Sequence, residues 1–270
     1  MQPTIVIGAA GRMGSAIVRQ VVQDEDLYLA AAIESPDSTH QGEDAAQVAG
    51  LAPCGVTITS DAVAAVGVNY AIIDFSAPDC TMAHIATSIQ KNCYVVIGTT
   101  GFSPEQRAQI EETAAGGRVV MAPNMSVGIN LLLALCGRVT PALGSDYDTE
   151  IVEAHHNRKK DAPSGTAHRL GEKIAEAKGV RYEDCVQHGR EGQAGPRSGD
   201  EIGVHAVRGG DIVGEHHVIY ATDGERIELT HKASSRQTFA KGAVRAVKFL
   251  LSADKGLYDM QDVLGLKDFA

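Results

Sequence analysis

The segment EAHHNRKKDAPSGTA, residues 153–167, concentrates side chains that can donate protons and bind anions. His155 and His156 end a predicted strand, so their side chains are expected to point to opposite faces of the sheet. Three cations follow at positions 158–160, and the middle one is Lys159. In a chain with a net charge of −10, these cations form a local positive patch that can attract an acidic substrate.

The second half of this segment has the pattern of a helix start. Ser164 is the expected N-cap, and Gly165 and Thr166 fall in the first turn of a helix predicted over 164–178. Backbone N–H groups in that turn, with the Thr166 hydroxyl, form a seat for a carboxylate or phosphate. The segment therefore predicts an anion site in which a cation and a helix N-terminus each hold an acidic group, and a histidine or lysine delivers a proton.

Less specific interpretations compete with this one. Adjacent histidines are often surface residues, and a run of cations is often a solvated face. A second pair, His216-His217, lies in mid-strand without basic neighbours in the sequence, and we assign it no chemistry. A zinc site at His155 and His156 is disfavoured because no cysteine and no H-x-x-x-H spacing is in register with them. We therefore expect no metal.

The first 126 residues alternate between short β-branched runs and helical patterns. Continuous apolar strands separated by helices predict a parallel sheet covered on both faces, which is a doubly wound Rossmann-type α/β domain. The expected strands are Thr4–Ile7, Leu29–Ile33, Val56–Thr59, Ala71–Phe75, Tyr94–Ile97 and Val119–Met121, and the expected helices are Arg12–Gln23, Asp79–Gln90 and Pro104–Ala115.

Gly8, Gly11 and Gly14 occupy the loop between the first strand and the first helix, in the pattern G-x-x-G-x-x-G. Such glycines let the backbone turn tightly and approach a pyrophosphate, which then lies at the helix N-terminus. Glu34 ends the second strand, where an acid accepts hydrogen bonds from the ribose hydroxyls. A tight turn without a ligand is the alternative, but the order of strand, loop and helix favours a bound dinucleotide.

The residues after Glu34 favour NADH over NADPH. A 2′-phosphate is usually bound by an arginine near the acid, whereas Ser35-Pro36-Asp37 follows Glu34 in this chain. The carboxylate of Asp37 would repel a phosphate, and Arg12 in the glycine loop is the cation that could assist one.

Two further loops follow the fifth and sixth strands, where ligands bind in sheets of this kind. They are GTTG, residues 98–101, and APNMS, residues 122–126. Their small and hydroxylated residues leave room for a flat ring, although the same patterns also occur in ordinary turns.

The pattern changes after residue 126 and predicts a second α+β domain with a mostly antiparallel sheet. The connections RGGD and TDGE have hairpin turn chemistry, so the last three strands should be adjacent and antiparallel, and the final helix should pack on the first domain. We expect residues 1–126 with 237–270 to form the dinucleotide-binding domain and 127–236 the domain for substrate binding and oligomerisation. The expected elements are a helix at 126–143, strands at 149–154, 202–207, 212–220 and 226–231, a loop at 186–200 and a helix at 239–251.

The bulk composition limits the class of protein. A net charge of −10 and a pI near 5.4 argue against a nucleic-acid partner. We expect no apolar run that approaches the roughly 18 residues of a membrane-spanning helix, and the N-terminus enters a strand without a basic signal region. The five cysteines are scattered, odd in number and never C-x-x-C, which favours reduced thiols and a cytoplasmic location.

Five motifs together resemble the dihydrodipicolinate (4-hydroxy-tetrahydrodipicolinate) reductase family. They are VIGAAGRMG, GTTGF, APNMSVGIN, EAHHNRKKDAPSGTA and HKASSRQTFAKGAVRA. The resemblance covers essentially the whole chain, and the fourth motif is far more specific than the glycine loop. It implies hydride transfer from NAD(P)H to C4 of a cyclic unsaturated dicarboxylate in lysine and diaminopimelate synthesis, carried out by a homotetramer joined through the sheet of the second domain.

The resemblance also implies roles for individual residues. His155 would be the proton donor or acceptor and Lys159 the second proton donor. Substrate would be bound by His156, Gly165 and Thr166. The cofactor would be lined by Gly8, Ala9, Ala10, Gly11, Arg12, Met13, Glu34, Gly98, Thr99, Thr100, Ala122, Pro123, Asn124 and Met125.

This chain departs from the family pattern at one position and leaves two other functions open. Many members carry arginine directly after the acid of the second strand, where this chain has Ser35, which weakens the case for NADPH. The alternatives are another NAD-dependent dehydrogenase of an amino-acid pathway and a non-catalytic NAD-sensing protein. The presence of His155, Lys159 and the Gly165-Thr166 pair argues against a sensor, which does not need a proton donor.

Overall fold

The structure, a computed structural model, describes residues 1–267 of the chain. It contains two compact units: Met1–Val127 with the C-terminal segment that begins at Arg236, and Gly128–Ser235. Of the segment 237–270 that the sequence assigns to the first domain, residues 268–270 lie outside the described part.

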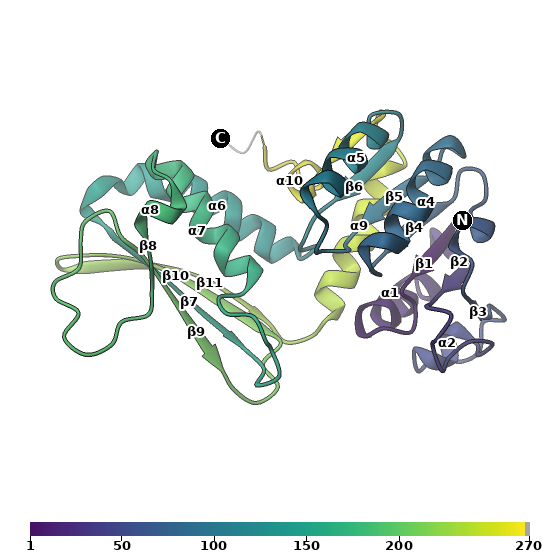
Figure 1. The fold of residues 1–270 in the computed structure, drawn as a ribbon, viewed down its shortest axis with the longest axis horizontal. Helices are drawn as coiled ribbons and strands as arrows, with labels where there is room; N and C mark the ends of the chain where they lie inside the picture. Colours follow the sequence, from purple (N-terminus) through teal and green to yellow (C-terminus); the bar gives the residue numbers. More distant parts are fainter. Residues whose placement is uncertain (268–270) are drawn as a thin grey trace. The chain divides into compact units, whose positions relative to one another are not determined.

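The first unit is built on a seven-stranded sheet in the order β12-β6-β5-β4-β1-β2-β3, with every pair parallel (Figure 1). All six strands expected from the sequence are present, so the Rossmann-type fold is confirmed. A short seventh strand at one edge was not expected. The strands are β1 (Gln2–Ile7), β2 (Leu27–Ile33), β3 (Ile58–Thr59), β4 (Ala71–Asp74), β5 (Tyr94–Ile97), β6 (Arg118–Met121) and β12 (Gly256–Tyr258).

Helices cover both faces of this sheet and enclose a separate apolar core on each. One core packs α1 and α9 against the sheet through residues such as Ile17 and Val247, so the final long helix joins the first unit as expected. The other core packs α4 and α5 through Ile85 and Ile110. The helices are α1 (Arg12–Val22), α2 (Ala45–Val48), α3 (Ala62–Ala65), α4 (Pro78–Gln90), α5 (Pro104–Ala114), α9 (Gln237–Leu250) and α10 (Met260–Val263).

The second unit has a five-stranded mixed sheet in the order β11-β10-β7-β9-β8. β7 pairs antiparallel with β10 and β10 antiparallel with β11, whereas β9 is parallel to both β7 and β8. Part of the segment expected to be a loop is strand β8. The strands are β7 (Asp148–His155), β8 (Val186–His188), β9 (Ile202–Arg208), β10 (Gly214–Thr222) and β11 (Glu225–Ala233).

The expected antiparallel pairing of β9 with β10 is wrong, because β7 lies between them. The RGGD connection does not fold back on itself. Its backbone bonds to the end of β7, with Gly209 N donating to His155 O at 2.9 Å and Asn157 N donating to Gly210 O at 3.2 Å. The TDGE hairpin is confirmed: Thr222 pairs with Glu225 across a two-residue turn.

Helices α6 (Val127–Leu143), α7 (Gly165–Lys178) and α8 (Tyr182–Cys185) lie along one face of this second sheet (Figure 1). They enclose a third core around Leu132, Leu170 and Tyr220. Among the described residues no helix covers the opposite face, where alternation along the strands places Val152 of β7 and Ile219 of β10.

The expectation about apolar runs needs a correction. Residues Val127–Asp146 are long and apolar enough to cross a membrane by length and composition, with a window of mean hydropathy 1.5. Core helices of soluble proteins pass the same test. Here Leu132 and Cys136 of α6 lie in the core of the second unit, and the Thr140 hydroxyl bonds Tyr220 Oη at 2.9 Å. Packing against the sheet therefore accounts for the apolar side chains on this face of the helix.

Candidate functional site

The end of β7 places His155 beside a buried carboxylate. His155 Nδ1 lies 2.7 Å from Glu153 Oε2, and both side chains point to the helix-covered face because they are two residues apart in a strand. The Glu153 side chain is fully buried, whereas that of His155 is 13 % exposed. The expected proton donor is therefore accessible on one side and held by a carboxylate on the other.

Glu153 also holds the start of α7. The backbone N–H of Ser164 donates to Glu153 Oε1 at 2.9 Å, and the Ser164 hydroxyl accepts from Ala167 N at 3.1 Å as the predicted N-cap. Gly165 is exposed at the first position of the helix, with Thr166 half-buried beside it. The histidine and the helix N-terminus are thus brought together through one carboxylate.

A guanidinium completes the environment of that carboxylate. Arg208 at the end of β9 donates through its two Nη atoms to the two oxygens of Glu153, at 2.7 and 2.8 Å. Burial raises the pKa of Glu153, but hydrogen bonds from His155, Arg208 and the Ser164 N–H outweigh it and lower this pKa to about 2. Glu153 is therefore an anion at neutral pH.

His216, to which the sequence assigned no chemistry, lies in the same cluster. Its Nε2 is 3.1 Å from the Ser164 hydroxyl, and its ring meets that of His155 edge-on with centroids 5.3 Å apart. It is 3 % exposed. Burial, followed by repulsion from His155, lowers the pKa of His216 to about 3, so this ring is neutral at pH 7. The structure therefore places His216 beside the candidate site, a position that the sequence did not predict.

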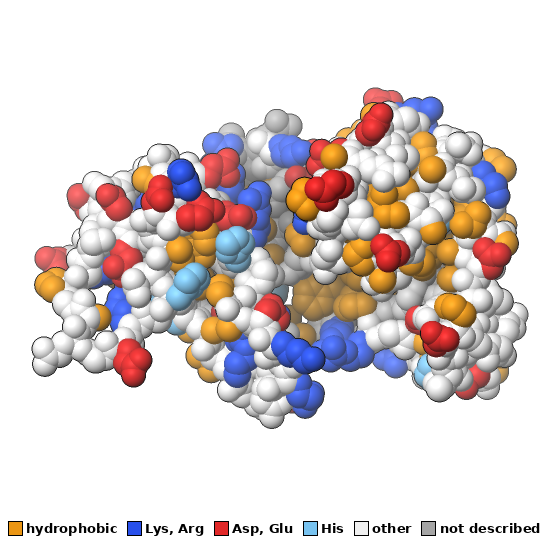
Figure 2. Space-filling view, viewed as in Figure 1, with side chains coloured by type: hydrophobic (Ala, Val, Ile, Leu, Met, Phe, Trp, Pro, Cys, Tyr) orange, Lys and Arg blue, Asp and Glu red, His pale blue; other side chains and the backbone are white. Residues whose placement is uncertain are grey.

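The three expected cations differ in their surroundings. Arg158 and Lys160 are exposed, whereas the Lys159 side chain is only 20 % exposed, and its Nζ pairs with Asp161 Oδ2 at 2.9 Å. His156 is half-buried just beyond the strand. The face drawn in Figure 2 shows acidic and basic side chains interspersed over the second unit, so the positive charge of this loop is a local feature.

In the first unit, the glycine loop lies where the strand order changes direction, between β1 and β4. Gly8 has a positive φ of 80°, and a Cβ on Gly14 would lie 1.9 Å from Gly8 O, so the start of α1 touches the loop directly. Gly11 is the N-cap of α1 and has no side chain to cap the first N–H groups. The loop therefore has the close backbone and open helix N-terminus that a pyrophosphate needs.

Glu34 lies against this loop. Its Oε2 accepts from Ala10 N at 2.9 Å and its Oε1 from Ser35 N at 2.9 Å. The carboxylate is thus held in place beside the glycine loop, where a ribose would meet it. Ser35 and the two residues after it are exposed.

A buried network connects the ends of β4 and β5. The Thr99 hydroxyl donates to Asp74 Oδ1 at 3.1 Å and accepts from Ser76 N at 3.1 Å. His84 Nε2 lies 2.8 Å from Asp74 Oδ2. Burial opposes ionisation of Asp74, but hydrogen bonds from His84, Ser76 and Thr81 outweigh it and lower the pKa of Asp74 overall. This network holds the start of the GTTG loop in place through the side chain of Thr99.

The aromatic ring of Phe75 closes the same region. A Cβ on Gly98 would lie 2.2 Å from this ring, and one on Gly8 would lie 2.4 Å from Phe75 O. Residues 75–76 therefore lie directly against the glycine loop, although the sequence analysis did not single them out as site residues. The signal was their position directly after a fully buried strand.

The other expected cofactor residues lie at the same edge of the sheet. Thr100 and Pro123 are exposed and Asn124 is half-buried, whereas Gly98, Thr99, Ala122 and Met125 are buried. In the glycine loop, Ala9 is buried, Ala10 and Met13 are half-buried and Arg12 is exposed. All of these residues belong to the first unit, and the expected catalytic and substrate residues belong to the second.

Comparison with known proteins assigns the chain to a family. Residues 3–125 match the family described as "Dihydrodipicolinate reductase, N-terminus", and residues 128–264 match "Dihydrodipicolinate reductase, C-terminus". The chain belongs to the dihydrodipicolinate reductase family.

Its relatives match over nearly their full length. The 4-hydroxy-tetrahydrodipicolinate reductases of Nitrosomonas eutropha and Hahella chejuensis are 49 % and 51 % identical to it over 262 residues, which are 97 % of this chain and 97 % and 98 % of theirs. A dipicolinate-bound dihydrodipicolinate reductase from Paenisporosarcina sp. TG-14 superimposes with a TM-score of 0.75 at 26 % identity, covering 97 % of this chain and 98 % of that one. The chain is therefore an oxidoreductase of this reductase family.

Within this reductase, the described residues contain no group of three or more His, Cys, Asp or Glu side chains placed to hold a metal ion. The histidines of the candidate site instead bond to Glu153 and Ser164.

Proposed function

We propose that this enzyme reduces 4-hydroxy-tetrahydrodipicolinate to tetrahydrodipicolinate with NAD(P)H, in lysine and diaminopimelate biosynthesis. Family membership over both halves of the chain supports the reaction. The single structural observation that supports it best is the cluster in which Glu153 holds both His155 and the N-terminus of α7. That cluster combines a proton donor with a seat for a carboxylate, as reduction of an acidic imine requires.

In this proposal the two units are the dinucleotide-binding domain and the substrate domain. His155 is the proton donor or acceptor and Lys159 the second proton donor. His156, Gly165 and Thr166 bind a substrate carboxylate. The cofactor lies on the glycine loop, Glu34 and the two loops that follow β5 and β6.

The chemistry requires an acid close to the substrate ring. A bound nicotinamide would supply a hydride to C4 of the conjugated imine that remains after the substrate loses water. Negative charge then accumulates on the neighbouring carbon or nitrogen, and a proton must neutralise it. His155 is a proton donor at the end of β7 and Lys159 an ammonium donor in the loop that follows, while the exposed helix N-terminus at Gly165 can hold a carboxylate in place.

NADH is the favoured cofactor in this proposal. Glu34 offers carboxylate oxygens to ribose hydroxyls, and exposed Ser35 provides no positive charge for a 2′-phosphate. Glu34→Ala should therefore raise the Kd for NADH about 10-fold, the equivalent of one charge-assisted hydrogen bond of roughly 1.5 kcal/mol, and change substrate KM less. Fluorescence titration of bound NADH measures the Kd.

Glu43→Ala is the matched control for this titration. Glu43 follows the same strand but bonds to His40 with its side chain 53 % exposed, so its loss should leave the Kd unchanged. Equal affinities for NADH in the wild type and Glu34→Ala would remove Glu34 from the cofactor site.

We propose further that the enzyme is a homotetramer in the cytoplasm, joined through the uncovered face of the second sheet. On this face Val207 is 48 % exposed and Val152 and Ile219 are half-buried, so these apolar side chains are available to pack against a second copy of the chain. All five cysteines are free thiols, as expected in a reducing compartment. Sedimentation velocity should give four times the chain mass of 28.4 kDa, and an Ile219→Lys chain should sediment as a smaller species.

Initial-rate oxidation of NADH and NADPH tests the reaction itself. The substrate is made in the cuvette from pyruvate and aspartate semialdehyde by the preceding synthase. Substrate-dependent loss of absorbance at the nicotinamide band, faster with NADH, is the expected result. Binding of both cofactors without turnover would instead favour a sensor.

A further inference from the structure

Glu153 makes more polar contacts than any role as a simple strand residue requires. It is fully buried, and its two oxygens accept four hydrogen bonds from three separate parts of the second unit: His155 on β7, Ser164 at the start of α7 and Arg208 on β9. A buried carboxylate is costly unless each lone pair is satisfied, so the arrangement is geometrically demanding.

The contact with His155 determines which ring nitrogen is free. Because the Glu153 carboxylate is ionised and can only accept, Nδ1 of His155 must donate. In the neutral ring the proton therefore lies on Nδ1, and Nε2 is the atom that gains and loses a proton. Space beside Nε2 is kept open by a glycine, since a Cβ on Gly214 would lie only 3.1 Å from it.

The contact with Ser164 determines the position of the proposed anion-binding site at the start of α7. Ser164 N donates to the same carboxylate, and the following residues begin α7, whose first turn contains Gly165 and Thr166. A shift of Glu153 would therefore move both His155, the proposed proton donor, and the anion-binding site at the start of α7.

We propose that Glu153 is a positioning residue for the proposed reduction: it holds His155 with Nε2 available for proton transfer and fixes the start of α7 at a set distance from that ring. The inference rests on the proposed function for its kinetic part. The geometry of the ring is testable without it.

The charge of Glu153 should also affect proton transfer. A carboxylate beside Nδ1 attracts positive charge on the ring, whereas a neutral amide in its place would not. Other charged or titratable groups face this region from the neighbouring segments: Lys159 and Asp161 in the following loop, Arg208 on β9, His216 on β10 and His231 on β11. A substitution at Glu153 alone leaves the identity of all of these groups unchanged.

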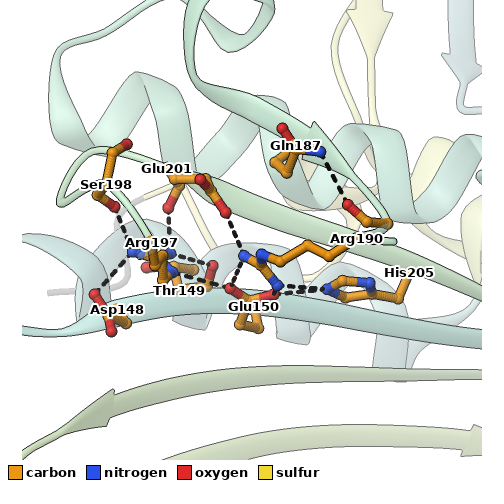
Figure 3. A network of polar contacts seen from close by, with 10 residues as sticks. Asp148, Thr149, Glu150, Gln187, Arg190, Arg197, Ser198, Glu201 and His205 are labelled. Atoms are coloured by element: carbon orange, nitrogen blue, oxygen red, sulfur yellow. Dashed lines mark hydrogen bonds and ion pairs between the residues drawn. The ribbon is translucent and has the colours of Figure 1, made fainter. Parts of the chain in front are cut away.

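Glu150 offers a matched comparison on the same strand. Its carboxylate accepts from Arg190 at 2.7 Å, Arg197 at 3.0 Å and His205 at 2.7 Å, and it is as strongly paired as Glu153 (Figure 3). Being three residues away along the strand, it points to the opposite face of the sheet, away from His155. Its loss disrupts an ion network of similar size without touching the ring.

The experiment compares Glu153→Gln with Glu150→Gln in full pH profiles of kcat and kcat/KM. Glu153→Gln should lower kcat about 10- to 100-fold, by analogy with loss of a carboxylate that orients a metal-bound histidine, and raise substrate KM. The alkaline limb of both profiles should also move to lower pH in this variant, because the ring has lost its anionic partner. Glu150→Gln should leave the position of that alkaline limb unchanged, and Glu153→Asp should restore it in part.

An unmoved alkaline limb in Glu153→Gln, or an equal shift in both variants, would reduce Glu153 to a structural residue. Solid-state 15N NMR of the histidine-labelled wild-type enzyme, assigned with His155→Gln, gives an answer even if Glu153→Gln does not fold. The neutral His155 ring should carry its proton on Nδ1, and a proton on Nε2 overturns the proposal. If the wild type binds NADH but reduces no substrate, the proposed function fails, and this NMR result still decides how the ring is held.

Discussion

Lys159→Ala is expected to cost about 2–5 kcal/mol of transition-state stabilisation in kcat/KM, by analogy with truncating one partner of a buried charge pair, here the pair that the ammonium would form with the bound substrate. That corresponds to a fall of roughly 30- to 5,000-fold. The Lys159 side chain is 20 % exposed, so much of its charge is shielded from water, and in the proposed reaction it supplies a proton. Steady-state rates with varied substrate and saturating NADH measure the effect.

The structure indicates that this loss would be catalytic and not a loss of folding. The partner of Lys159, Asp161, is 61 % exposed and can be solvated when the lysine is removed. Thermal unfolding of Lys159→Ala should therefore stay close to that of the wild type. Lys160→Ala, one residue along the same loop and exposed, is the control and should retain its rate. A Lys159→Ala enzyme with wild-type kcat/KM would exclude the lysine from the reaction.

The first unit could be predicted from sequence because its signals are local. β5 was expected at Tyr94–Ile97 and has those bounds, since a short run of buried β-branched residues between helices has few other structures available. Gly8 and Gly14 could be placed for the same reason: the strand, loop and helix that need them are contiguous. The short elements β12, α2 and α3 were missed because each has fewer than five residues and little periodicity of its own.

The second unit could not be predicted to the same extent because its arrangement depends on pairing between distant strands. The chain reaches β10 directly after β9, yet both lie beside β7, and the decisive backbone bonds join Gly209 and Gly210 to the end of β7. Local turn chemistry carries no information about a third strand. The hairpin at Asp223-Gly224 was predictable because both of its strands are neighbours in sequence.

The candidate site was recognised from one segment, but its supporting residues were not. His216 had a usable signal: Gly214, His216, Val218 and Tyr220 alternate along β10, which places this histidine on the buried face with two core residues. The sequence contained no comparable signal for Arg208, because a lone arginine at the end of a strand is usually solvated. Only the fold brings its guanidinium to Glu153.

Acid should destabilise the second unit through two glutamates. Burial raises the pKa of Glu150, but hydrogen bonds from Arg190, His205 and Arg197 outweigh it and lower the pKa to about 2, the same value as for Glu153. A carboxyl whose pKa is depressed on folding contributes stability that is complete above its unfolded pKa of about 4.5 and is lost as the pH falls through its folded value. Each should therefore contribute about 3 kcal/mol at pH 7, which disappears between about pH 4.5 and 2.

Urea unfolding followed by far-UV circular dichroism, at one protein concentration and a series of pH values, measures this loss. The decisive comparison is between the wild type and Glu153→Gln, because glutamine cannot titrate. At pH 7 the variant should be less stable, since a neutral amide cannot satisfy Arg208 and His155 as the carboxylate does. As the pH approaches 2 the wild-type carboxylate also becomes neutral, so the difference between the two unfolding free energies should shrink. A difference that stays constant from pH 7 to pH 2 would mean that the negative charge of Glu153 does not stabilise the fold. Its hydrogen bonds would then stabilise the fold equally well when the carboxyl group is neutral.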